Sequence, residues 1–381
     1  MPQIIAALIL VLALAACLPA PADVSAPSPV ASPTATVART IPETPGLPTP
    51  TATRVVRSTP APAQTVSGTP TPTRASQNPF GLMIGPDALG LDRRLALAKS
   101  LGGAYFRPVD LFVDQWRGVC ADCPAIERSG LKALLTVRAN GTPQTATKPP
   151  TDHDAFKRSI LDIIDKQRLE VLVVENEELS VENFYAGLPH EYAAELKTAC
   201  EAAHLRRIKC TNGGLVSGDV VLLVWAHYAE KYNPSYACAY VQRTLDAQTA
   251  GTLCNARRIT QLPPKLQGSV NRARAFLPLY KMSGADYLNF HWYVADAQAL
   301  EEAVTYLRQA TGLPVISNEM GQQTDNAAIV QPLLQKALDL GLPYVIWYSV
   351  DAPKARGLNN PDGSLRATGK MFQEFMQARF K

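Results

Sequence analysis

Histidine pairs, basic clusters and long apolar runs are scarce in this chain of 381 residues. The histidines are scattered, and none forms an H-x-H or H-E-x-x-H pair: His153, His190, His204, His227 and His291. Their spacing argues against a zinc hydrolase, and we expect no metal and no organic cofactor. Lys and Arg (37 together) nearly balance Asp and Glu (33), without a cluster that would follow phosphates. Nucleic acid is therefore not an expected partner.

The longest uncharged apolar run stands at the N-terminus. Residues 4–16 (IIAALILVLALAA) are too few for a comfortable membrane span but fit the hydrophobic region of a signal peptide, which we place at 1–16. Leu14-Ala15-Ala16-Cys17 resembles a bacterial lipobox, which implies cleavage before Cys17 and a lipid on its sulfur atom. An ordinary signal peptide with an incidental cysteine is the alternative.

Residues 17–78 contain the lipobox cysteine and then a linker. Pro, Thr, Ala, Ser and Val dominate it, with PTPTATR and TPTPTR as near-repeats. Such a segment cannot bury enough apolar surface to offset its chain entropy, and its prolines keep it extended. We expect a lipid-anchored or secreted protein at the extracellular face of the cell envelope, with one folded domain at 79–381. We expect it to be a monomer whose membrane contact is the lipid.

The folded part retains six cysteines: Cys120, Cys123, Cys200, Cys210, Cys238 and Cys254. An even number in an exported protein indicates disulfide bonds. Six cysteines allow about fifteen pairings, and the sequence does not choose among them. Cys200–Cys210 and Cys238–Cys254 are the favoured pairs, because each closes a short local loop. Cys120 and Cys123 would form the third.

From residue 79 onward, short apolar β-branched runs alternate with amphipathic helical stretches. The runs are 80–85, 103–109, 132–139, 169–177, 208–214, 286–293, 314–321 and 343–351. Eight such alternations predict a (β/α)8 TIM barrel; an open doubly wound sheet is the alternative. No Gly-rich phosphate loop follows the first run, which argues against the dinucleotide-binding form of that alternative. Residues 215–275 are too long for one crossover and predict an insertion after the fifth strand.

Two glutamates close two of the predicted strands. Glu177 ends the run LEVLVVENE, and Glu319 ends LPVISNE. In a parallel barrel the carboxyl ends of the strands meet at one rim, so the two side chains should converge. Paired carboxylates at one rim can supply the acid/base and the nucleophile that break a glycosidic bond.

The other predicted strand ends bring polar and aromatic residues to the same rim. They are Arg107, Arg138, Asn176, Asn212, His291, Tyr293 and Trp347. Sugar sites need hydrogen-bonding groups for hydroxyls and aromatic faces for the apolar side of pyranose rings. A carbohydrate is therefore the expected substrate.

These residues, taken in order, resemble the motifs of the clan-A glycoside hydrolases, which are retaining (β/α)8 enzymes. Asn176-Glu177 at the fourth strand is similar to that clan's Asn-Glu pair, which implies that Glu177 is the general acid/base and Asn176 binds the sugar 2-hydroxyl. Glu319-Met320-Gly321 at the seventh strand resembles its Glu-x-Gly nucleophile motif. The clan often has Trp-Asn-Glu-Pro, whereas this chain has Glu175-Asn176-Glu177-Glu178.

The resemblance extends to three further strands. His291-Trp292-Tyr293 is similar to the clan's His-x-Tyr element, which implies a hydrogen bond from Tyr293 to the nucleophile. Trp347 matches a tryptophan that floors the glycone site, and Arg107 matches an arginine that contacts the nucleophile carboxylate. The resemblance implies a retaining glycosidase that cleaves β-linkages of an extracellular poly- or oligosaccharide.

The environment of each glutamate must suit its role. Glu177 needs apolar walls or a negative neighbour to stay protonated, whereas Glu319 needs donors such as Arg107 and Tyr293 to stay ionised. We expect Glu175 and Glu178 to support the site or to face solvent. The alternative function is a barrel that binds carbohydrate without cleaving it, or a structural surface lipoprotein.

Overall fold

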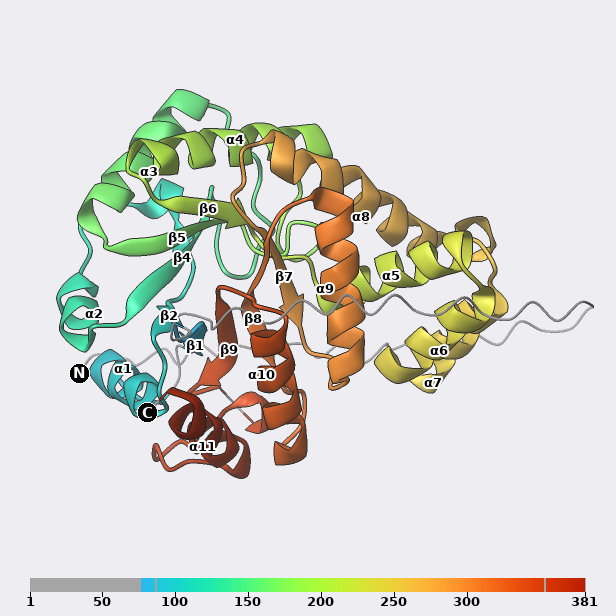
Figure 1. The fold of residues 1–381 in the computed structure, drawn as a ribbon. Coiled ribbons are helices and arrows are strands. Elements are labelled where there is room, and N and C mark those ends of the chain that lie inside the picture. Colours follow the sequence, from blue (N-terminus) through green and yellow to red (C-terminus); the bar gives the residue numbers. More distant parts are fainter. Residues whose placement is uncertain (1–76, 86–87, 353, 381) are drawn as a thin grey trace, which may run out of the picture. The chain divides into compact units, whose positions relative to one another are not determined.

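The structure is a computed structural model that describes residues 77–85, 88–352 and 354–380 (Figure 1). The predicted signal peptide, Cys17 and the linker up to residue 76 lie outside these residues. Asn78, which belongs to the predicted linker, contacts the barrel, because its Nδ2 donates to the carbonyl of Gly102 at 2.9 Å. No helix in the described part of the chain is both long and apolar enough to cross a membrane.

Eight parallel strands form the barrel: β1 (Phe80–Ile84), β2 (Tyr105–Arg107), β4 (Lys132–Arg138), β5 (Leu169–Val174), β6 (Lys209–Asn212), β7 (Leu288–Trp292), β8 (Val315–Gly321) and β9 (Val345–Val350). Their order is β6-β5-β4-β2-β1-β9-β8-β7, and a short strand β3 (Leu111–Phe112) pairs with β4. Parallel bridges Thr211–Tyr287 and Leu215–Phe290 join the two ends of this path. The (β/α)8 prediction is therefore confirmed, and the open-sheet alternative is wrong.

Helices follow the strands and cover the outside of the barrel (Figure 1). They are α1 (Leu91–Ser100), α2 (Cys123–Ser129), α3 (His153–Lys166), α4 (Pro189–Leu205), α9 (Ala297–Thr311), α10 (Val330–Asp339) and α11 (Ala367–Phe380). Between β6 and β7 lie α5 (Ser217–Lys231), α6 (Pro234–Thr244), α7 (Ala247–Asn255) and α8 (Pro264–Met282). Single 3-10 turns are η1 (Val113–Gln115), η2 (Ile259–Gln261), η3 (Ala327–Ile329) and η4 (Lys354–Arg356).

The strands are apolar on both faces because both faces are buried. In β5, Val171 and Val173 point into the barrel, where they pack with Ile316 and Ile346. The alternate residues of β5 belong to the outer core beneath the helices. Strand β5 therefore contributes to two hydrophobic layers.

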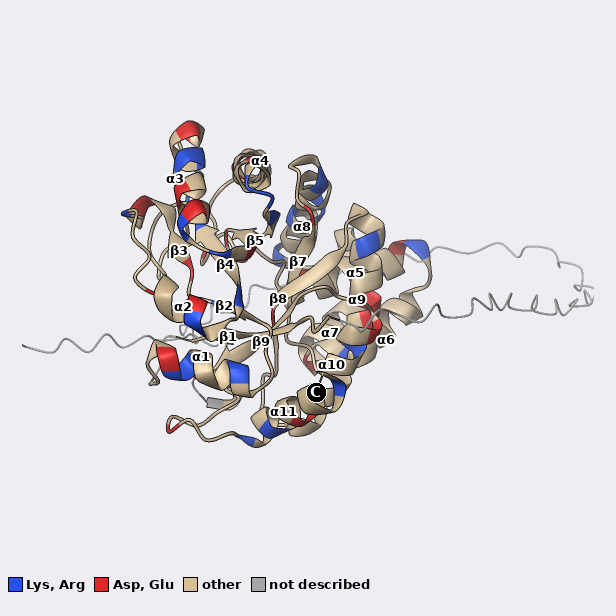
Figure 2. Ribbon diagram, turned by 60° about the vertical axis from the view of Figure 1, so that its left-hand side comes forward, with Lys and Arg blue, Asp and Glu red and all other residues tan. Residues whose placement is uncertain are grey.

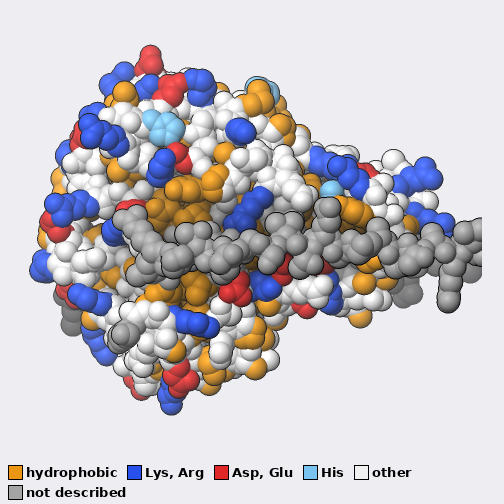
Figure 3. Space-filling model, in the orientation of Figure 1, with side chains coloured by type: hydrophobic (Ala, Val, Ile, Leu, Met, Phe, Trp, Pro, Cys, Tyr) orange, Lys and Arg blue, Asp and Glu red, His pale blue; other side chains and the backbone are white. Residues whose placement is uncertain are grey.

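Helix α3 illustrates how the outer layer forms. Its buried side chains recur at helical spacing: Phe156, Ile160, Ile163 and Ile164. Asp152 caps its N-terminus by accepting from the backbone N–H of Ala155 at 2.9 Å. Figure 2 shows acidic and basic residues interspersed along this helix, and Figure 3 shows both charge signs among hydrophobic side chains on one face.

All three predicted disulfide bonds form: Cys120–Cys123, Cys200–Cys210 and Cys238–Cys254. The second joins α4 to β6, and the third joins α6 to α7. Trp225 is fully buried in α5.

Candidate active site

Glu319 projects from β8 into a ring of donors. Arg107 on β2 donates from Nη1 to Oε2 of Glu319 at 2.7 Å. Tyr293, just beyond β7, donates its hydroxyl hydrogen to Oε1 at 2.5 Å. Burial alone would raise the pKa of the Glu319 carboxyl group, but the nearby charges of His291 and Arg107 and these two hydrogen bonds hold that pKa below its usual value. The environment therefore favours an ionised Glu319.

Arg107 also fixes the orientation of Asn176. Its Nη2 donates to Oδ1 of Asn176 at 2.8 Å and to Oδ1 of Asp110 at 3.2 Å. Because the amide oxygen of Asn176 accepts from Arg107, the amide NH2 group is directed elsewhere and can donate to a ligand. A single planar guanidinium thus holds both the carboxylate of Glu319 and the amide of Asn176.

Glu177 lies in the turn after β5, whereas the sequence predicted it as the last residue of that strand. Strand β5 ends at Val174, and the following turn has positive φ angles at Glu175 (67°) and Glu177 (45°). Such angles are uncommon outside glycine and cluster at functional sites. The turn directs Oε1 of Glu177 to Nδ1 of His291, 2.9 Å away.

His291 lies between the two glutamates and is fully buried. Its Nδ1 is 2.9 Å from Glu177 and 3.9 Å from Oε2 of Glu319. Burial lowers the pKa of the imidazole, but the charges of Glu319 and Glu177 outweigh this and raise it overall. One oxygen of each glutamate and one ring nitrogen all lie within 4.8 Å of one another.

These three side chains are of the types that bind divalent metal ions. Arg107 already places a positive charge 2.7 Å from Glu319 and is itself buried. The negative charge of the cluster is therefore partly balanced by protein groups.

Solved structures resemble this fold at low sequence identity. The exo-β-1,4-mannosidase Op5Man5 from Opitutaceae bacterium strain TAV5 is 15% identical with a TM-score of 0.50, over 79% of this chain and 59% of the mannosidase. The GH39 enzyme from Xanthomonas axonopodis pv. citri is 13% identical with a TM-score of 0.50, over 80% and 67% of the two chains. No family model and no curated protein matches the chain. These likenesses show the barrel fold, and the chain spans less than two thirds of the mannosidase.

The hydrogen bonds and distances above bring six of the predicted site residues together: Arg107, Asn176, Glu177, His291, Tyr293 and Glu319. Trp347 does not join them. It is fully buried in the layer between β9 and α11, where it packs against Phe372, and its Nε1 donates to Gln322 at 2.7 Å. The aromatic ring next to Tyr293 is Tyr348, with centroids 5.9 Å apart. The aromatic residue of β9 beside Tyr293 is thus Tyr348 and not Trp347.

Asn212 also lies away from the cleft. It is fully buried, and its Nδ2 donates to Oε1 of Glu178 at 2.8 Å and to the carbonyl of Asn289 at 3.0 Å. Its own amide oxygen accepts from the backbone N–H of Asn289 at 2.7 Å. Asn212 thus holds the seam between β6 and β7 instead of contacting a substrate.

Glu175 and Glu178 support the site and do not face solvent, since both are fully buried. Oε1 of Glu175 accepts from the backbone of Ala139 at 2.6 Å, and Oε2 accepts from the Thr147 hydroxyl at 2.6 Å. Burial raises the pKa of Glu175 and of Glu178. A further buried carboxyl group, Glu195 on α4, has a pKa well above its usual value because of burial and the charge of Glu175.

Asp219 was missed by the sequence analysis. It belongs to the first turn of α5, and burial together with the charges of Glu177 and Glu178 raises its pKa to about 7. Its electrostatic coupling to Glu177 places a third carboxyl group near the proposed acid/base. An acidic residue at a helix start is common in sequences, so nothing in the pattern distinguished this one.

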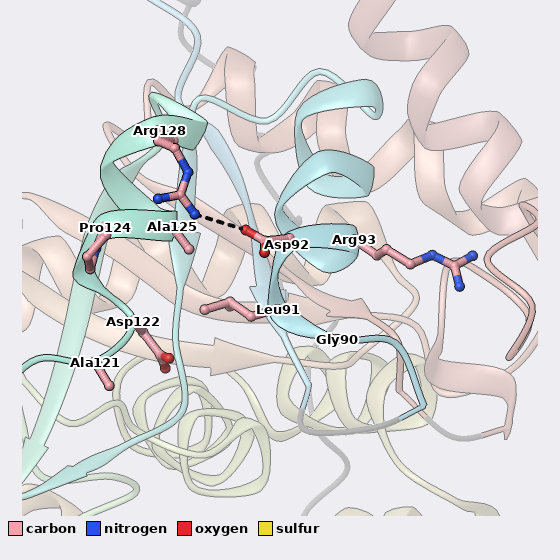
Figure 4. A pocket seen from close by; sticks show the side chains of 9 residues that line it. All are labelled: Gly90, Leu91, Asp92, Arg93, Ala121, Asp122, Pro124, Ala125 and Arg128. Atoms are coloured by element: carbon pink, nitrogen blue, oxygen red, sulfur yellow. Dashed lines mark ion pairs between the residues drawn. The ribbon is translucent and has the colours of Figure 1, made fainter.

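Two cavities differ in their relation to the site. One of about 360 Å³ shares Tyr293 with the cluster and is lined by Ser217 and Val221 of α5, Thr244 of α6 and Gln323, among others. The other, of about 400 Å³, lies between the start of α1 and helix α2, where Asp92 and Arg128 pair at 3.6 Å (Figure 4). Because none of the six clustered residues lines the second cavity, the first is the natural extension of the site.

Proposed function

We propose that this protein is a retaining glycoside hydrolase that cleaves β-glycosidic bonds of an extracellular poly- or oligosaccharide. The observation that carries the proposal is the approach of Glu177 and Glu319, whose oxygens lie within 4.8 Å of each other. Retaining enzymes hold their carboxyl groups about 5–5.5 Å apart, whereas inverting enzymes separate them by about 6.5–9.5 Å to admit a water molecule. The closer spacing supports the retaining chemistry.

The two carboxyl groups have different partners, as two different roles require. Glu319, held by Arg107 and Tyr293, is the nucleophile that attacks the anomeric carbon. Glu177 donates a proton to the departing glycosidic oxygen and later removes one from the water that hydrolyses the glycosyl–Glu319 ester. The NH2 group of Asn176 is placed to donate to a sugar hydroxyl. No metal or organic cofactor is required for this double displacement.

The cellular location is part of the proposal. Cleavage before Cys17 and lipidation would anchor the barrel at the outer side of the membrane, with residues 18–78 as a spacer. Three disulfide bonds support an oxidising compartment. Mass spectrometry of the mature N-terminus tests this, because an unmodified Cys17 would contradict the anchor.

Turnover of aryl β-glycosides and β-linked oligosaccharides tests the function. We expect the first-formed sugar to be the β-anomer by proton NMR, and a 2-deoxy-2-fluoro glycoside to label Glu319 covalently. Glu177→Gln should lower the turnover of substrates whose leaving group is a sugar by about 10²–10⁴-fold, because such a leaving group needs a proton. Glu182→Gln, an exposed change of the same type, is the control. An α-anomer as first product would contradict retention, and tight glycan binding without turnover would favour the non-catalytic alternative.

A further inference from the structure

The side chain of Asn289 has one possible orientation. Its Oδ1 accepts from the backbone N–H of Asn318 at 2.9 Å. Its Nδ2 donates to the backbone carbonyl of Asn212 at 3.2 Å. Backbone groups have fixed donor and acceptor roles, so these two bonds establish which end of the amide is oxygen.

The orientation of Asn289 determines that of Asn318. The Nδ2 of Asn289 also donates to the side-chain oxygen of Asn318 at 2.7 Å. That oxygen is 3.0 Å from Nε2 of His291. A carbonyl oxygen can only accept, so Nε2 of His291 must carry a hydrogen atom. The ring is fully buried.

The other ring nitrogen then faces the proposed acid/base. With hydrogen on Nε2, a neutral His291 presents a lone pair at Nδ1, 2.9 Å from Oε1 of Glu177. A lone pair and an ionised carboxylate would repel each other at this distance, so a hydrogen atom must lie between them. The pair therefore holds one proton, either on Glu177 or on His291.

Several other charged or titratable groups act on this pair. Glu319 lies 3.9 Å from Nδ1, and the charge of Arg107 opposes protonation of the ring. Glu178 interacts with His291, and Asp219 on α5 interacts with Glu177. The raised pKa of His291 shows that the surrounding carboxylates outweigh burial and Arg107.

We propose that Asn318, oriented by Asn289, positions His291 so that Glu177 and His291 share one proton and the general acid stays loaded between turnovers. The catalytic part of this proposal rests on the proposed function, whereas the hydrogen on Nε2 does not. When Glu319 attacks the anomeric carbon and the glycosidic C–O bond breaks, the shared proton passes to the leaving oxygen and Glu177 remains as a carboxylate. In the second step a water molecule attacks the anomeric carbon, the bond to Glu319 breaks, and one proton of the water returns to the pair, so the proton count closes over the cycle.

The ring tautomer is tested on the full chain labelled with ¹⁵N-histidine. Long-range proton–nitrogen spectra distinguish a protonated from an unprotonated ring nitrogen, and a His291→Gln variant assigns the His291 signals. His204→Gln, a change at an exposed ring, should remove a different set and is the control. We expect Nε2 of His291 to be protonated throughout the titration. A hydrogen on Nδ1 with a bare Nε2 in the neutral wild type would overturn the proposal.

Two substitutions at Asn318 separate positioning from general structural support. Asn318→Ala removes the acceptor, so imidazolium is less stable and His291 should titrate about one pH unit lower. Asn318→Asp supplies a charged acceptor and should move the titration upward by a similar amount. The alkaline limb of kcat/KM should move in the same two directions, with smaller effects on KM.

The outcomes distinguish this proposal from the proposed function. Equal shifts in the same direction for both variants, or no shift, would contradict a positioning role even if glycosidase activity is present. If the spectra are as expected but the protein hydrolyses no glycoside, the shared proton between Glu177 and His291 is supported and its role in catalysis is contradicted. Wild-type spectra decide the tautomer even if both variants are poorly folded.

Discussion

Tyr293 and Glu319 come from neighbouring strands, and the hydroxyl hydrogen of Tyr293 is donated to Oε1 of Glu319 at 2.5 Å. Burial is the main reason why the pKa of the Tyr293 hydroxyl lies well above its usual value. The charge of Glu319 and the hydrogen bond to it raise this pKa further. Tyr293 therefore remains a donor across the whole physiological range. The tyrosine also lines the adjoining cavity, so it contacts both Glu319 and that cavity.

Removing this hydroxyl group should weaken the nucleophile site. Tyr293→Phe leaves one oxygen of Glu319 without its donor, so the pKa of Glu319 should rise and the acidic limb of kcat/KM should move to higher pH. A hydrogen bond to a charged group contributes about 1.5–3 kcal/mol, which corresponds to about 10–100-fold in turnover. Tyr236→Phe, at an exposed ring, is the control. An unchanged pH profile would show that this bond does not tune Glu319.

The amide of Asn176 should recognise a substrate hydroxyl group. Asn176→Asp keeps an oxygen for Arg107 but replaces the NH2 donor with an acceptor. We expect kcat/KM to fall by about 10–100-fold for an ordinary glycoside, as loss of one strengthened hydrogen bond predicts. For a 2-deoxy glycoside the same substitution should lower kcat/KM far less, because this substrate has no 2-hydroxyl group to accept from the Asn176 amide. Equal losses on both substrates would contradict the assigned contact.

Much of the barrel could be predicted because burial on both faces leaves a clear apolar pattern in strands such as β5. The convergence of Glu177 and Glu319 follows from the shared polarity of parallel strands. The turn after Val174 could not be predicted, because positive φ angles at Glu175 and Glu177 oppose local preference and depend on tertiary contacts.

The two misplaced residues have separate physical causes. The pairing of β1 with β9 shifts register between Leu82 and Ile84, just after the position that pairs with Trp347. It is Tyr348, the next residue, that lies beside Tyr293. Strict alternation cannot reveal such an irregularity. Asn212 is buried where β6 and β7 meet through isolated bridges, and its side chain completes hydrogen bonds across that seam.

The Cys238–Cys254 bond should stabilise α6 and α7 locally. Its sequence separation is 16 residues, for which loop-closure entropy predicts about 3 kcal/mol. Replacing both cysteines with serine should speed hydrogen exchange in these helices while β4 and β5 remain protected. Replacing both Cys120 and Cys123 with serine is the control. These cysteines are only three residues apart, so their bond closes a shorter loop and its loss should have a smaller effect on stability. Uniform loss of protection would mean that the bond stabilises the whole barrel.

Glu195 should limit stability at higher pH. Its pKa is raised well above the usual value by burial and by Glu175, so the folded state binds the proton more tightly than the unfolded state. This contribution is fully present below the unfolded pKa and is lost as pH rises toward the folded pKa. In the wild type the Tyr185 hydroxyl donates to Oε2 of Glu195 at 3.0 Å. Glu195→Gln keeps an oxygen that can accept this hydrogen bond, but its side chain cannot ionise. Its stability relative to wild type should therefore increase from pH 5 to pH 8, by up to about 1.4 kcal/mol per pH unit. Urea unfolding at both pH values measures this, with exposed Glu182→Gln as the control. A difference from wild type that is the same at pH 5 and pH 8 would show that Glu195 does not hold its proton in the fold.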